Sequence, residues 1–360
     1  MYTRLASVAK NESDVKRIIE YGHFAICEEG NGFLTLVGPS GKTQLRSYSW
    51  SLEKMDSFDV VRLSERGTPQ IVYAHSNDDN AIVLTDRCNS NCIMCPYSEN
   101  HRRKAEDFDY DYICQLIDYL PSDIPHLIIT GGEPTLLNDV FLRVIEQLKA
   151  KFENTDFLLL TNGRTMADKV FAKKVIEVAP SRILYGIPLH GPNSLVHDTI
   201  SQVNGSFLQT VQGVKNLLER AADVEIRIVI SRLNYEFLDE TVAFLVKNLP
   251  NVNRVTFMAM EMCGAAAINK ERVWIDYKTA AKNAEMAARI LISKGIKVLF
   301  YNFPLCMVDK GFWPLCADSI TDCKIRFSES CISCAVRSIC GGVFSTTLGI
   351  SGMSLIPVKE

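Results

Sequence analysis

Between residues 81 and 260, short apolar segments alternate with amphipathic ones, and this alternation constrains the fold more than any other feature. Six segments have the pattern of buried strands: Ala81–Thr85, Leu127–Thr130, Phe157–Thr161, Ile183–Pro188, Val224–Ser231 and Arg254–Met260. Helical patterns lie between them: Asp109–Leu120, Val140–Lys151, Met166–Val178, Leu208–Arg220 and Leu238–Asn248. Strands joined through helices form a parallel sheet with right-handed crossovers. A closed eight-stranded barrel needs two more units, so we predict an α/β fold with an open, TIM-like partial (βα)6 barrel.

Residues 1–78 predict a separate small α+β unit in front of the barrel. Glu12–Tyr21 has helical periodicity, and two short strand-like runs, Phe24–Cys27 and Gly32–Val37, follow it. The next residues, Gly38–Thr43, read GPSGKT, but only two residues separate the glycines where a phosphate-binding loop needs four. This spacing favours a hairpin turn over a nucleotide site.

The barrel is expected over residues 79–264, and residues 265–360 form a third part. In that part an amphipathic helix, Tyr277–Lys294, and one further strand, Lys297–Tyr301, precede a cysteine-rich tail. The chain therefore divides into an N-terminal unit, a barrel and a C-terminal region.

Composition narrows the classes of function. The net charge of −3 gives no reason to expect a nucleic-acid partner. No apolar run approaches the ~18 residues that span a bilayer, and Met1–Lys10 lacks the apolar segment of a secretory signal, so we expect a cytoplasmic protein without a membrane partner. Twelve cysteines in a reducing compartment favour metal or cluster ligation over disulfides. Three of them, Cys27, Cys114 and Cys263, are scattered and are expected to be incidental.

Three cysteines follow the first predicted strand in the spacing C-x3-C-x2-C: Cys88, Cys92 and Cys95. A cubane iron–sulfur cluster takes four thiolates, so three leave one iron open to a small molecule. The alternatives are a zinc site without its fourth ligand and buried core thiols. Zinc sites commonly use C-x2-C pairs, so the spacing favours a cluster. The motif resembles that of radical S-adenosylmethionine (SAM) enzymes, in which SAM chelates the open iron of a [4Fe-4S] cluster and yields a 5′-deoxyadenosyl radical.

A glycine pair follows the second predicted strand, in the run Thr130–Pro134. Gly131 and Gly132 let the backbone approach a ligand closely, and the Glu133 carboxylate can accept hydrogen bonds from an ammonium group. A glycine turn with no ligand is the alternative. The run resembles the GGE motif of the radical SAM family, which implies that Gly131, Gly132, Glu133 and Pro134 bind the methionine amino group of SAM.

The resemblance implies further cofactor contacts at the other strand ends. Asn162, in a Thr-Asn-Gly turn, and His190 are expected near the cofactor, although an ordinary turn and a solvated histidine are the alternatives. Arg227 lies in an apolar strand, where an unpaired charge is costly, so it either awaits a carboxylate or faces water at an edge. Asn234 is expected to be a polar contact. Met94, before the third cysteine, takes the place of an aromatic residue that meets the adenine.

Four more residues carry expectations. Gln202 stands where many family members have an arginine after a His-Asp pair, here His197 and Asp198. That pair is more typical of a helix start, where Asp198 caps. Glu261, at the end of the sixth strand, is expected to face the mouth of the active site.

The tail contains six further cysteines, at a density far above the rest of the chain. It ends in C-x2-C-x5-C, which resembles the twitch or SPASM extensions that hold auxiliary clusters in radical SAM enzymes. Six thiolates cannot complete two four-thiolate clusters, so one auxiliary [4Fe-4S] cluster is the simpler count, with a structural zinc as the rival. Its expected ligands are Cys306, Cys331, Cys334 and Cys340, with Cys316 and Cys323 as spares.

Taken together, the motifs resemble those of the His-Xaa-Ser system radical SAM maturases, in particular the C-type partner, over roughly residues 81–357. The resemblance implies an oxidoreductase-like enzyme that modifies a ribosomally made peptide (a RiPP) by hydrogen abstraction. Its partners would be SAM, the peptide, an external electron donor and a second maturase. Residues 1–78 either dock a leader peptide by strand addition or act as an inert cap. The alternatives are a radical SAM enzyme that acts on a small molecule or nucleotide, and a non-catalytic metal-binding or cluster-binding protein.

Overall fold

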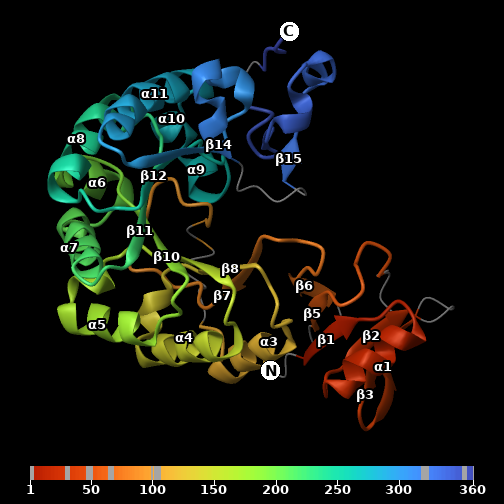
Figure 1. Cartoon of the computed structure of the whole chain (residues 1–360). Helices are drawn as coiled ribbons and strands as arrows, with labels where there is room; N and C mark the ends of the chain where they lie inside the picture. The colour runs from red at the N-terminus through yellow and green to blue at the C-terminus, as the bar shows by residue number, and fades with distance from the viewer. Residues whose placement is uncertain are drawn as a thin grey trace.

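The computed structural model describes residues 4–28, 33–45, 52–63, 69–98, 100, 107–317, 324–350 and 355–359. Two sheets dominate it, and a short hairpin lies near the C-terminus (Figure 1). No helix within the described ranges is long and apolar enough to cross a membrane.

The larger sheet has eight strands in the order β14-β13-β12-β11-β10-β9-β8-β7, and every pair of neighbours is parallel. The seven predicted strands are present at nearly the predicted bounds: β7 (Asn80–Val83), β8 (His126–Thr130), β9 (Asp156–Leu160), β10 (Ile183–Pro188), β11 (Asp223–Val229), β12 (Arg254–Met258) and β13 (Lys297–Tyr301). The two-residue strand β14 (Cys316–Ala317) is an addition that periodicity cannot show. Because the strands follow in chain order, all their carboxyl ends meet at one rim.

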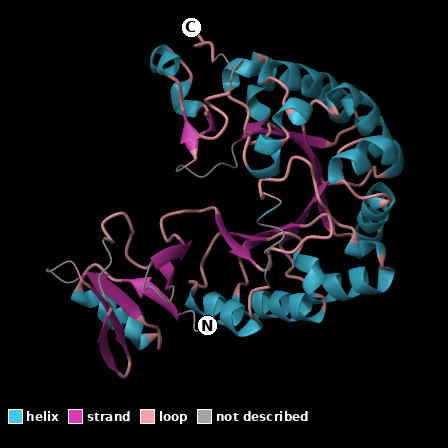
Figure 2. Cartoon of the chain, turned by 180° about the vertical axis from the view of Figure 1, so that it is seen from behind, coloured by secondary structure: helices cyan, strands magenta, loops and turns pink. Residues whose placement is uncertain are grey.

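Helices cover the outer face of this sheet in an arc, and both Figure 1 and Figure 2 show the inner face open on the opposite side. The predicted helices are present: α3 (Tyr110–Tyr119), α4 (Asp139–Lys151), α5 (Lys169–Val178), α7 (Ser206–Leu218), α8 (Leu238–Asn248) and α11 (Tyr277–Ser293). Three short helices were not predicted: α6 (Ser194–Ser201), α9 (Gly264–Ile268) and α10 (Lys270–Val273). They are too short for a full apolar stripe, so periodicity alone does not reveal them.

The N-terminal unit is a six-stranded mixed sheet in the order β4-β3-β2-β1-β5-β6, with one helix, α1 (Glu12–Glu20). Its strands are β1 (Arg4–Val8), β2 (Ala25–Glu28), β3 (Leu34–Gly38), β4 (Gly41–Gln44), β5 (Val60–Leu63) and β6 (Pro69–Tyr73). The β3–β4 pair is antiparallel with Gly38 opposite Gly41, which confirms the predicted hairpin turn.

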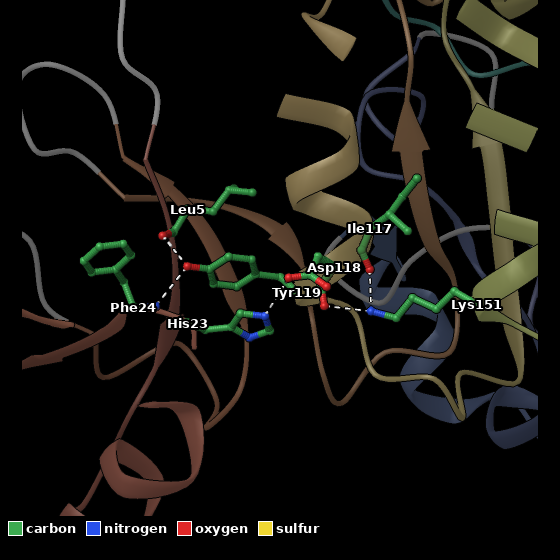
Figure 3. A network of polar contacts seen from close by, with 7 residues as sticks. All are labelled: Leu5, His23, Phe24, Ile117, Asp118, Tyr119 and Lys151. Carbon is green, nitrogen blue, oxygen red and sulfur yellow. Dashed lines mark hydrogen bonds and ion pairs between the residues drawn. The ribbon is translucent and has the colours of Figure 1, made fainter. Parts of the chain in front are cut away.

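Tyr119, at the end of α3, fastens the N-terminal unit to the sheet domain (Figure 3). Its hydroxyl accepts a hydrogen bond from the amide of Phe24 (2.9 Å) and donates one to the carbonyl of Leu5 (3.0 Å). The ring of His23 stacks on the Tyr119 ring with 4.0 Å between centroids, and its Nε2 lies 3.2 Å from a carboxylate oxygen of Asp118. One tyrosine therefore ties two strands of the unit to α3.

Lys151 supports the same contact from α4. Its Nζ donates to the carbonyls of Ile117 and Asp118, each at 2.7 Å, and so satisfies carbonyls at the end of α3 (Figure 3). A hollow of about 690 Å³ lies between the N-terminal unit and this part of the sheet domain.

The C-terminal residues lie at the opposite end of the arc from the N-terminal unit (Figure 1). The hairpin β15 (Ile325–Arg326) and β16 (Val343–Phe344) carries the last three cysteines in the connection between its strands. The boundary that we expect at residue 265 falls just after β12, whereas β13 still joins the main sheet. The division into three parts stays a prediction.

Candidate active site

The three cysteines of the C-x3-C-x2-C loop line one cavity of about 420 Å³ at the carboxyl ends of β7 and β8. Thr130, Gly131 and Gly132 line the same cavity. The two motifs, which lie about 40 residues apart in the chain, therefore share one site, as the parallel sheet requires.

Neighbouring loops hold the cysteine loop in place. The amide of Ile93 donates to the carbonyl of Ile200 at the end of α6 (2.9 Å). The carbonyl of Cys95 accepts a bond from the amide of Ala265 in α9 (2.9 Å). Burial raises the pKa of the Cys88 thiol, whose sulfur accepts a bond from the amide of Ser90.

The glycine pair is required by the cysteine loop itself. A Cβ built on Gly131 would collide with the carbonyl oxygen of Thr85, and one on Gly132 would collide with that of Arg87. The amides that follow bond to these oxygens: Gly132 to Thr85 and Glu133 to Arg87, both at 2.7 Å. The glycines thus make room for a neighbouring backbone, while they also line the cavity, and their contact with a ligand stays a prediction.

The Glu133 carboxylate is fully buried and turned into the protein. Oε1 accepts bonds from the amide (3.2 Å) and hydroxyl (2.6 Å) of Thr135 and from the hydroxyl of Thr161 (2.7 Å), and Oε2 accepts one from the amide of Asn162 (2.6 Å). Burial raises its pKa, against the opposing effect of these bonds. Pro134 begins the next short helix and is buried. We predicted that this carboxylate contacts an ammonium group, whereas in the structure it is hydrogen-bonded to groups inside the protein.

Asn162 lies beside the cysteine loop, and its expected contact with the cofactor stays a prediction. Its Nδ2 donates to Oδ1 of Asn89 (2.6 Å) and lies 4.0 Å from the sulfur of Cys88. Arg164, two residues on, was not predicted: its Nη1 donates to the carbonyl of Asn89 and to the hydroxyl of Ser90 (3.1 Å). The arginine of a Thr-Asn-Gly-Arg turn, opposite a polar cysteine loop, is the signal that could have shown this.

His190 and Asn234 are both buried inside the protein. Burial lowers the pKa of His190 to about 3 and that of His197, whose ring stacks beside it, to about 4. The amide nitrogen of Asn234 donates to the carbonyls of His190 (3.1 Å) and Val229 (3.0 Å), and its oxygen accepts from the amide of Ser231 (2.7 Å). Asn234 thus joins the ends of β10 and β11, which differs from the predicted cofactor contact.

The His-Asp pair lies within α6 instead of at a helix start. Asp198 does act as a cap, but for the next helix: its carboxylate accepts bonds from the amides of Gly205 (2.7 Å) and Phe207 (2.8 Å) and the hydroxyl of Ser206 (2.7 Å). Gln202 connects the two helices in the left-handed conformation.

Arg227 lies on the inner face of β11. Because side chains alternate between the two faces of a strand, Glu225 and Val229 lie on the same face. Its guanidinium lies 5.6 Å from the Tyr301 ring centroid, and its buried Nε has no hydrogen-bond partner among the described residues. Two residues earlier on the strand, Glu225 pairs with Arg254 at 3.1 Å. Arg227 therefore faces the inner side of the sheet, where its Nε–H has no acceptor among the described residues.

Met94 lines a second hollow, of about 330 Å³, together with Val229, Met258 and Phe344. Three residues line both this hollow and the first cavity: Pro96, Glu261 and Lys324. The two spaces thus meet along the inner side of the cysteine loop. Glu261 is at the rim, as predicted, and lies 3.6 Å from the ammonium of Lys324.

Cys263, which we expected to be incidental, lines the first cavity with the three loop cysteines. Gly264 allows this approach, because a Cβ there would collide with the carbonyl of Pro96 and its φ is +56°. Burial, and after it the nearby Glu261 carboxylate, raise the pKa of the Cys263 thiol to about 11. Only the fold reveals this residue, since it is 168 residues from Cys95 in the chain.

The four tail cysteines that we selected line a common small hollow: Cys306, Cys331, Cys334 and Cys340. Polar groups point at three of the sulfurs. The amide of Leu305 donates to Cys340 and that of Val358 to Cys334, and the hydroxyl of Ser328 meets Cys331, each at 3.4 Å. Burial raises the pKa of the Cys306 thiol to about 11. Of the two spares, Cys316 lies in β14, and Cys323 lies outside the described residues.

Part of this chain is similar in sequence to known proteins. Residues 82–245 match the model of the radical SAM superfamily. The chain is 28% identical to GTP 3′,8-cyclase of Petrotoga mobilis over 193 residues, which cover 52% of this chain and 58% of that protein. It is 28% identical to the mycofactocin maturase MftC of Mycolicibacterium smegmatis over 218 residues, which cover 60% of this chain and 52% of that one.

Among solved structures, Streptococcus suis SuiB bound to S-adenosylmethionine matches with a TM-score of 0.47 and 17% identity, covering 70% of this chain and 53% of that one. The chain thus spans little more than half the length of these proteins.

Proposed function

Because residues 82–245 match the model of the radical SAM superfamily, we propose that this chain reductively cleaves SAM and uses the radical to modify a ribosomally made peptide. The supporting observation is the cavity in which three thiols of one loop face the backbone of Thr130–Gly132. A [4Fe-4S] cluster on Cys88, Cys92 and Cys95 would supply the electron and leave one iron for SAM.

The residues around the cavity fit the two ends of SAM. Since the Glu133 carboxylate is used inside the protein, the backbone of Thr130–Gly132 would meet the amino group. The adenosine end would occupy the second hollow against Met94, whose flexible apolar side chain suits a ring face. Arg227 offers an unpaired donor for a carboxylate.

An auxiliary [4Fe-4S] cluster on the four tail thiols is the second part of the proposal. Hydrogen bonds to sulfur from two amides and a hydroxyl are typical surroundings of a cluster. A single zinc would draw four sulfurs to about 2.3 Å from one point.

The cysteine-bearing hairpin favours peptide modification, because Phe344 of the hairpin and Lys324 directly before it also line the second hollow. The maturase MftC is among the similar proteins, as is a GTP cyclase, so a nucleotide substrate is the second candidate. Assignment to the His-Xaa-Ser system, with its partner maturase, and a leader-docking role for residues 1–78 belong to the proposal as well.

The core claim is tested by anaerobic reconstitution and assay for 5′-deoxyadenosine with dithionite. Wild type should bind about eight irons per chain and form 5′-deoxyadenosine. Cys92→Ala should keep about four irons and form none, whereas Cys334→Ala should keep the other four. Cys27→Ala, a thiol of the N-terminal sheet, is the matched control and should equal wild type. Well-loaded wild type that forms no 5′-deoxyadenosine would refute the proposal.

The substrate class is tested separately with the peptide of the neighbouring open reading frame and with GTP. A mass change of the peptide that requires SAM supports the proposal. Conversion of GTP with an unchanged peptide would transfer the assignment to the nucleotide class.

A further inference from the structure

Another hollow, of about 190 Å³, reaches the cysteine loop from the solvent side. It is lined by the middle of the loop, by Gln202 and by α9 and α10: Asn91, Cys92, Ile93, Gln202, Ala265, Ile268, Asn269 and Arg272. Cys92 lines both this hollow and the inner cavity. Its side chain is therefore part of the wall between the site and solvent.

Hydrogen bonds fix this wall on both sides. The amide of Asn91 donates to the carbonyl of Ser201 (3.0 Å), and the Nδ2 of Asn269 donates to the carbonyl of Ile93 (3.2 Å). Cys92, between them, is thus held from α6 and from the α9–α10 turn. A partner that docks here meets a preformed surface.

The hollow is lined mostly by polar side chains, with Ile268 as its exposed apolar residue, and cationic side chains lie at its rim. Ile268 is 71% exposed. Lys270 and Arg272 belong to α10, and Arg232 lies against it, with its Nη1 2.9 Å from the carbonyl of Glu271. The exposed Glu271 lies in α10 between Lys270 and Arg272, so the patch sets three cations against this carboxylate. Among the described residues no carboxylate lines the hollow itself, although the whole chain has a net charge of −3. A cationic patch attracts an anionic partner.

The proposed function, on which this inference rests, needs one electron from outside for each SAM cleaved. We propose that α9, α10 and Asn91–Ile93 form the docking surface of an acidic one-electron carrier protein. One electron passes from the reduced carrier to the group held by the three cysteines, and no covalent bond or proton moves. Small, partly apolar interfaces with charged rims are typical of transient electron-transfer complexes.

Binding is measured with reduced and oxidised flavodoxin, an acidic one-electron carrier, and the reconstituted protein without SAM. Lys270→Glu/Arg272→Glu should weaken binding about tenfold at low ionic strength, and the difference should shrink in high salt. A zero-length carbodiimide cross-linker should join Lys270 to carboxylates of the flavodoxin. Lys174→Glu, on the exposed face of α5, is the matched control and should bind as wild type does.

Three results would overturn the docking surface: unchanged flavodoxin binding by the double variant, equal weakening by Lys174→Glu, or cross-links that avoid α10. The stopped-flow rate of cluster reduction gives a second readout. The double variant should slow reduction by flavodoxin about tenfold but leave reduction by dithionite, which needs no docking, unchanged. If wild type forms 5′-deoxyadenosine with dithionite and the variants bind normally, only the docking surface fails. If no cluster forms, the proposed function fails first.

Discussion

The buried carboxylate of Glu133 permits a test that separates a structural role from ligand binding. Each of its oxygens faces a backbone N–H: Thr135 on one side and Asn162 on the other. Glu133→Gln replaces one oxygen by NH2, so either orientation of the amide sets a donor against a donor. One hydrogen bond to a charged group is lost, at about 1.5–3 kcal/mol, and a buried amide is left unpaired, at about 1–3 kcal/mol more.

We therefore expect Glu133→Gln to lose about 3 kcal/mol of unfolding free energy, measured by denaturant titration. In a domain of this size the Tm should fall by roughly 6–12 °C. Glu146→Gln, on the exposed face of α4, is the control and should stay within about 0.5 kcal/mol of wild type.

A direct contact between Glu133 and the SAM amino group predicts a different outcome, with weaker SAM binding at unchanged stability. If the Tm of Glu133→Gln stays within about 1 °C of wild type, the buried, internally bonded carboxylate described above is wrong.

Three further perturbations follow from the structure. Burial lowers the pKa of His197 to about 4, so the imidazole binds a proton near pH 6.5 in the unfolded chain but not in the folded chain. The free energy of unfolding therefore falls as the pH drops from about 6.5 to 4. His197→Gln should reduce that slope by up to about 1.4 kcal/mol per pH unit, as denaturant titrations at several pH values will show. Tyr119→Phe should cost about 1–2 kcal/mol and speed hydrogen exchange in β1 and β2, whereas Tyr21→Phe, 69% exposed, should do neither; slow exchange in both would refute the anchoring role. Gly132→Ala should cost about 1–3 kcal/mol and lower the iron content, because its Cβ meets the cysteine loop, and full loading at wild-type Tm would contradict this.

The main sheet was predictable because its strands are short apolar runs with one fully buried face, even though the other face is partly exposed. Segments such as Ile183–Pro188 read as continuous apolar runs, and the helices between them carry one apolar stripe each. The N-terminal unit was less predictable. Its strands β5 and β6 are short and separated by residues without a clear pattern, so only pairing with β1 and with each other defines them.

In the candidate site, too, the sequence could predict only some of the residues. Cys88, Cys92 and Cys95 were predictable because they are close in sequence and their chemistry depends on spacing. Cys263 was not, because its place beside them depends on a left-handed glycine, Gly264, at the start of α9. Local spacing reveals ligands within one loop, whereas a residue from a distant strand end becomes visible only when the sheet is assembled.

The glycine–glycine–glutamate run shows that a recognised motif can have a structural role that its sequence does not reveal. Glycines at a strand end admit a ligand or a second backbone equally well, and a carboxylate can accept an ammonium group or amides. Here the glycines admit the carbonyls of Thr85 and Arg87, and the carboxylate accepts the amide of Asn162. The run therefore holds the loop after β7 against the turn after β9. A ligand in the cavity would then be recognised by the backbone that these contacts position.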